Sequence, residues 1–145
     1  MIKEFSVVSE LKSIREQKSR LSERENELST PMIKDLSVIP LIYKWFCEIQ
    51  GNRDCPGRNE SAHLRKKFIF IILFLYAPSV LAGGRIPNGL RDEIAEAINL
   101  KDITFISHNV KAVVFMYNNY KDFRKDIEYL YIEIINRLKV KGLIN

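Results

Sequence analysis

Apolar residues recur along the chain at intervals of three and four positions, without the strict apolar–polar alternation of a half-buried strand. Spacings of three and four place side chains on one face of an α-helix, whereas alternation is typical of a β-strand. Glycine and proline are few, with 6 and 5 residues, which also favours long helices. The pattern therefore predicts an all-α fold of about six helices.

Residues 1–30 are predicted to form an N-terminal amphipathic helical arm with a seven-residue repeat. One position of the repeat is occupied by Val7, Ile14, Leu21 and Leu28, and the companion position by Leu11, Lys18 and Glu25. A stable coiled coil needs apolar residues at both positions. The arm is therefore either a weak or short coiled coil or a helix that packs on its own domain.

Residues 31–145 are predicted to form a helical domain. Its first helix is expected from about Met32 to Gln50, with Pro31 at its first position and Pro40 kinking or splitting it. The following stretch, residues 51–61, is dense in turn-forming residues and is the clearest loop of the chain.

An apolar run from Phe68 to Leu81 follows two lysines and resembles a signal peptide or a membrane segment. It starts too far into the chain for a signal peptide, and it is shorter than the ~20 apolar residues that span a bilayer. Pro78 also interrupts it. We interpret the helix from about Ala62 to Leu81 as the buried centre of the domain, with membrane association as a weaker alternative.

Two shorter helices are expected next, from Leu90 to Asn99 and from Thr104 to Asn119. The small residue Ala95 permits close approach of the second helix, and Asn99 tolerates the left-handed backbone conformation that a tight turn requires. Thr104 is expected to cap the second helix. A final helix from about Asp122 to Lys139 carries an apolar face made by Phe123, Ile127, Leu130, Ile134 and Leu138.

The segment of about 90–119 resembles the helix-turn-helix family of DNA-binding proteins, in which Ile-Ala-x-x-Leu-Gly-x is followed by Thr-Val-Ser and a helix. The matching residues here are Ile94-Ala95, Asn99-Leu100 and the run Thr104 to Ser107. The resemblance implies a tri-helical core, with the preceding buried helix as its third member. The second helix of such a unit lies in the DNA major groove.

The resemblance also implies roles for individual residues. Residues expected to meet base edges are Thr104, Ser107, His108 and Lys111, and those expected to contact phosphates are Arg85, Arg91 and Lys101. The formal net charge of +5 permits a polyanionic partner without requiring one. The excess of positive charge lies in residues 51–67 and 101–145, on both sides of this segment.

Other chemistry finds little support in the sequence. Cys47, Cys55 and His63 are evenly spaced, but a structural zinc site needs four ligands and no fourth is evident. Catalytic motifs and phosphate-binding glycine loops are also missing, so we expect no enzyme, cofactor or metal. The aromatic series in residues 115–131 is interpreted as core and dimer surface rather than a single-strand nucleic-acid platform. Two cysteines suggest a reducing, cytoplasmic location.

The sequence therefore favours a small transcriptional regulator from a bacterium, phage or mobile element that binds double-stranded DNA. Dimerisation through the N-terminal helix or the final helix would match a two-fold operator. The alternative is a non-enzymatic helical assembly or adaptor protein, such as a phage structural component, whose partner is another protein.

Overall fold

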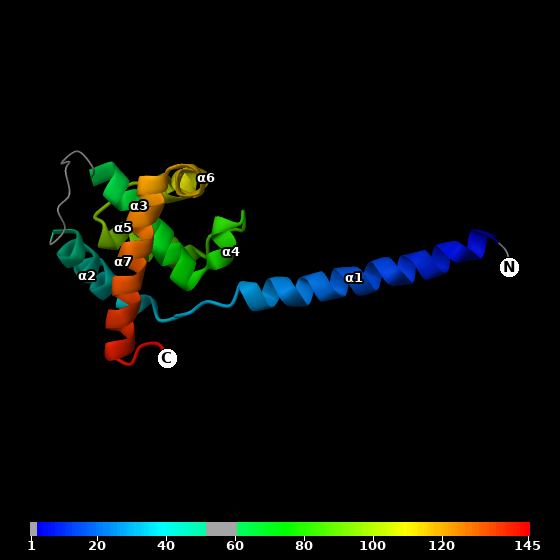
Figure 1. Cartoon of the computed structure of the whole chain (residues 1–145). Coiled ribbons are helices and arrows are strands. Elements are labelled where there is room, and N and C mark those ends of the chain that lie inside the picture. The colour runs from blue at the N-terminus through cyan, green and yellow to red at the C-terminus, as the bar shows by residue number, and fades with distance from the viewer. Residues whose placement is uncertain (1–2, 52–60) are drawn as a thin grey trace. The chain divides into compact units, whose positions relative to one another are not determined.

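The computed structural model describes residues 3–51 and 61–145. Within these ranges the chain forms seven α-helices and two short 3-10 helices and no strand, which confirms the all-α class (Figure 1). The elements are η1 (Lys3–Phe5), α1 (Ser6–Leu28), η2 (Leu36–Val38), α2 (Ile39–Gly51), α3 (Ser61–Tyr76), α4 (Pro78–Leu81), α5 (Asn88–Ala97), α6 (Thr104–Asn119) and α7 (Lys121–Val140).

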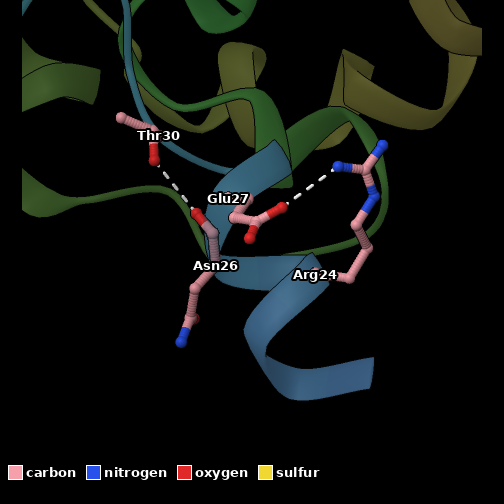
Figure 2. Close-up of polar contacts among 4 residues, drawn as sticks. All are labelled: Arg24, Asn26, Glu27 and Thr30. Atoms are coloured by element: carbon pink, nitrogen blue, oxygen red, sulfur yellow. Dashed lines mark hydrogen bonds and ion pairs between the residues drawn. The ribbon is translucent and has the colours of Figure 1, made fainter. Parts of the chain in front are cut away.

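The chain divides into two compact units, Met1–Thr30 and Pro31–Asn145. The first unit consists of η1 and α1, and none of the described residues in these helices is buried. Figure 2 shows how α1 ends. Arg24 pairs with Glu27 at 3.1 Å, and the Thr30 hydroxyl donates to the carbonyl oxygen of Asn26 at 3.0 Å. The Thr30 hydroxyl thus satisfies a carbonyl group at the end of the helix before Pro31 excludes a further turn.

The second unit begins with a segment that is not helical, so the expected helix start at Met32 is wrong. The backbone N–H groups of Met32 and Ile33 donate to the carbonyl oxygen of Leu75, at 2.9 and 3.3 Å. Helical structure begins only at η2, where the Asp35 carboxylate accepts from the Ser37 backbone N–H at 2.9 Å. Pro40 is the second residue of α2, directly after η2, and the first turn of a helix tolerates proline.

Helix α3 lies at the centre of the second unit, which confirms the interpretation of the apolar run as core. It packs against α2, α4, α5, α6 and α7 (Figure 1). Its completely or almost completely buried residues are Phe68, Ile69, Ile71, Ile72, Leu73 and Leu75. Within the described part of the chain, no helix is long and apolar enough to cross a membrane.

Pro78 divides the apolar run into α3 and α4, which adds one helix to the expected six. Ala77 adopts φ −157° and ψ 70°, because the residue before a proline is excluded from the helical region. Helix α4 then ends at a glycine pair. Gly83 has φ 103°, and the Gly84 N–H donates to the Ser79 carbonyl at 2.8 Å. These bonds redirect the chain toward α5.

Helix α7 has the expected apolar face, and that face is used inside the unit. Its five buried residues are Phe123, Ile127, Leu130, Ile134 and Leu138. They pack where α7 meets α2, α3 and α6. This face, which we had considered as one possible dimer surface, is therefore occupied by the chain's own core.

Candidate nucleic-acid interface

The C-terminal turn of α5 has the local geometry that the sequence predicts. Asn99 has φ 56°, the left-handed conformation expected at this position. The Leu100 N–H donates to the Ala95 carbonyl at 2.8 Å, and the Asn99 N–H donates to the Glu96 carbonyl at 3.2 Å. These two bonds form a Schellman motif, which satisfies carbonyl groups that the helix end leaves open. The motif ends α5 and allows the chain to turn toward α6.

The N-terminus of α6 is capped differently from our expectation. Thr104 is the first residue of the helix rather than its cap. Asp102 supplies the acceptor, since its carboxylate receives the Thr104 hydroxyl at 2.5 Å and the Thr104 backbone N–H at 3.0 Å. The same two bonds, in that order, lower the pKa of Asp102 from its ordinary value of 3.8. The carboxylate therefore fixes both the helix start and the Thr104 rotamer.

One face of α6 is exposed and carries the four side chains expected to meet base edges. Residues 104, 107, 108 and 111 are all exposed, and their spacing places them on adjacent turns of a single helix face. The opposite face is buried through Ile106, Val113 and Met116. The packing of α6 on α3 and α5 thus presents Thr104, Ser107, His108 and Lys111 to solvent together.

Four of the seven predicted site residues line one open cavity of about 380 Å³ between the α4–α5 connection, the start of α5 and α6. They are Arg85, Arg91, Ser107 and Lys111. Arg91 connects two of the segments, since its Nη1 donates to Ser107 Oγ at 3.2 Å. Residues that we had assigned separately to phosphate and base contacts therefore share one site.

The remaining three predicted residues lie outside this cavity lining. Thr104 and His108 lie on the same exposed face of α6, one turn or less from Ser107. Lys101 is exposed in the connection between α5 and α6. All three are therefore accessible to solvent, beside the cavity lining rather than in it.

Sequence reasoning missed the backbone that shapes this cavity. Gly83, Gly84 and Asn88 contribute to its lining. A Cβ atom on Gly84 would lie 2.9 Å from the Ser79 carbonyl oxygen, so only glycine fits the turn without a shift. In the sequence, Gly83 and Gly84 predict the end of a helix. Their position beside α6 depends on tertiary packing, which the sequence pattern does not show.

Of the basic residues of segment 51–67, Lys67 has a structural role inside the second unit. Arg53 and Arg58 lie outside the described residues. Lys67 is buried, with its ammonium group 2.9 Å from the Asp126 carboxylate and 5.8 Å from the centre of the Phe123 ring. The Lys67 charge is thus used inside the core and is not presented to a ligand.

The next residues to place are Cys47, Cys55 and His63, whose spacing was considered above for a zinc site. Cys47 is exposed on α2. Cys55 lies outside the described residues. His63 is exposed at the start of α3 and contacts the edge of Phe123, with the ring centres 6.5 Å apart. Among the described residues, no three potential metal ligands cluster.

Comparison of the chain with models of protein families, with curated proteins and with solved structures found no match. The assignment of a function therefore depends on the geometry described above.

Proposed function

We propose that the chain binds double-stranded DNA and that α6 is the helix that enters the major groove. The observation that carries the proposal is the exposed polar face of α6, with cationic side chains of α5 and of the α4–α5 connection beside it. A recognition helix needs exposed polar side chains near its N-terminus and a buried face that anchors it. Helix α6 has both features.

The arrangement of α5 and α6 supports a helix-turn-helix unit with α3 as the third helix. Helix α3 contacts both of the others. Ala95 is 2% exposed and Ile94 is fully buried. The buried face of α5 therefore carries the small side chain of Ala95 next to the large side chain of Ile94. The connection, residues 98–103, is longer than the roughly 3–4 residues usual for this unit. The extra length accommodates the Asp102 cap.

The hydrogen bonds already present define what each side chain offers to DNA. The Ser107 hydroxyl oxygen accepts from Arg91, so its proton remains available for a base acceptor. The Thr104 hydroxyl donates to Asp102, so only its lone pairs remain available. Lys111 supplies a cationic donor that suits the acceptor edge of guanine. We assign Arg85, Arg91 and Lys101 to phosphate contacts, which position the protein without specifying the sequence.

The test is duplex binding by the full chain at two salt concentrations, followed by the variant Ser107→Glu. Affinity should fall steeply as salt rises, because phosphate contacts release counterions. Ser107→Glu places negative charge on the reading face and should weaken binding by about tenfold or more. Asn136→Glu adds the same charge at an exposed position of α7 and is the matched control. Absence of duplex binding at low salt, or equal binding by both variants, would contradict the proposal.

The exposed apolar side chains of α1 favour a partner helix as a second component of the function. Val7, Leu11, Ile14, Leu21 and Leu28 are all 40% or more exposed, although their repeat is that of a packing face. We propose that a second copy of α1 covers them, which would form the dimer that a two-fold operator requires. If duplex binding fails, the same stripe favours the alternative of a non-enzymatic assembly or adaptor protein.

A further inference from the structure

We infer that the cavity between the α4–α5 connection, α5 and α6 is a binding site for a phosphate group, with room for a small organic phosphate. The inference goes beyond DNA binding, because a site of this kind can bind a free ligand in the absence of DNA. Its basis is the combination of a defined cavity, three cations and a hydroxyl group.

The charges around the cavity are unbalanced. Arg85, Arg91 and Lys111 line it, whereas no carboxylate is among the described lining residues. No ion pair joins any of these three cations to an acidic side chain within the described ranges. Three neighbouring positive charges repel one another, and an anion placed between them removes that repulsion.

Arg91 is the central residue of the site. Its side chain is half-buried, and its Nε is buried without a hydrogen-bond acceptor in the described structure. A guanidinium group stays charged at all physiological pH values, and a buried charge is normally paired. The hydrogen bond from Nη1 to the neutral Ser107 oxygen orients the group but supplies no negative charge. An anionic ligand would complete the environment of Arg91.

The chemistry of the donors favours phosphate among the anions. A guanidinium fork matches two phosphate oxygens, and lysine and serine can each donate to further ones. The donors come from three different segments, so a ligand with several oxygens in a tetrahedral arrangement is better served than a planar carboxylate.

The size and the apolar lining indicate a ligand larger than the phosphate group itself. The volume of about 380 Å³ lies in the lower part of the roughly 300–1,000 Å³ range of small-molecule sites. Val80, Ile86 and Val110 add apolar surface beside the cations. An organic phosphate would place its charged group at Arg91 and its remaining part against these side chains. A backbone phosphate of DNA is the other source of the same chemistry.

The experiment uses the full chain and three probes: inorganic phosphate, adenosine monophosphate and a DNA duplex, each titrated by calorimetry at constant ionic strength. Arg91→Gln should weaken phosphate binding by about tenfold or more, since a charge-assisted hydrogen bond is lost. Lys111→Gln and Arg85→Gln change exposed residues and give the same test if the Arg91 variant fails to fold. Lys44→Gln removes an exposed cation from α2 and is the matched control.

The outcomes separate this inference from DNA binding. Binding of adenosine monophosphate that is weakened by Arg91→Gln but not by Lys44→Gln supports a small-ligand site, whether or not the duplex binds. Binding of the duplex alone, with a smaller salt dependence in Arg91→Gln, would leave Arg91 as a contact to the DNA backbone and would overturn the site for a free phosphate ligand. Failure of all three probes, or equal binding by Arg91→Gln, Lys111→Gln and the unmodified chain, overturns the inference.

Discussion

The ammonium group of Lys67 lies 2.9 Å from a carboxylate oxygen of Asp126, which stands 59 positions later in the chain. This ion pair joins the central helix α3 to α7 inside the second unit. The Lys67 side chain is 8% exposed and that of Asp126 is 27% exposed. A lysine at the edge of an apolar run is thus drawn into the core because a partner from another helix meets it there.

Removing the Asp126 carboxylate should lower the free energy of unfolding more than removing the carboxylate of an exposed ion pair. Asp126→Asn leaves the buried Lys67 charge without this carboxylate, and we expect the free energy of unfolding to fall by about 2–4 kcal/mol. Glu48→Gln is the control, because the Glu48–Arg137 pair at 2.8 Å is much more exposed and should contribute less than about 1 kcal/mol. Urea unfolding of both variants measures the difference. Equal losses would show that burial does not strengthen the first pair.

The left-handed backbone at Asn99 gives a test of the α5–α6 turn. Asn99 is exposed with φ 56°, so a substitution there changes backbone strain more than packing. Asn99→Ala should destabilise the chain by about 1 kcal/mol, because a Cβ without a local hydrogen-bonding group is disfavoured in this region. Asn99→Gly should be neutral or slightly stabilising, since glycine adopts this conformation freely. The midpoint of thermal unfolding should therefore be highest for Asn99→Gly, intermediate for the unmodified chain and lowest for Asn99→Ala. The reverse order would contradict the described turn.

The Asp102 cap makes stability depend on pH on the acid side. Its pKa in the folded chain lies below the ordinary value of 3.8, because Thr104 donates two hydrogen bonds to the carboxylate. A lowered pKa means that its contribution is fully present well above pH 3.8 and is lost as the pH falls from there through the folded pKa. Asp102→Asn should therefore flatten the stability profile below about pH 4.

The measurement is the midpoint of thermal unfolding across acid pH, with the variant compared at each value. Asp35 has a similarly lowered pKa, caused by hydrogen bonds from Ser37, so Asp35→Asn is a matched variant at the start of η2. Each substitution alone should reduce the fall of the unfolding midpoint with decreasing pH, and the double variant should reduce it further. An unchanged slope in both variants would show that neither cap contributes.

Self-association through α1 should depend on its apolar stripe. Leu21 is 70% exposed, and Leu21→Glu places charge within the seven-residue repeat. We expect this variant to shift the chain from dimer to monomer in analytical ultracentrifugation, because a charged residue at a buried seam position opposes association. Ser22→Glu adds the same charge beside the stripe and should leave the dimer intact. A chain that is monomeric at every concentration before substitution would refute the proposed role of α1.

The sequence by itself determined the helices and much of their burial. The three- and four-residue spacing predicts α6 with the bounds that the structure shows and α7 to within a residue or so, because this periodicity is a local property of the chain. Asn99 likewise predicts a left-handed turn, and Pro78 predicts a break between two helices. Both predictions follow from steric rules that involve only neighbouring residues.

Tertiary structure decided where the first helix of the second unit starts and which charges meet. Met32 is not part of a helix, and its N–H group instead donates to the carbonyl of Leu75, which is distant in sequence. Lys67 is buried because α7 brings Asp126 to it. The candidate site needs Arg85, Arg91 and Lys111 from three segments, and their meeting depends on how α4, α5 and α6 pack on α3. Local patterns fix the faces of single helices, whereas the contacts between faces arise only when the helices pack together.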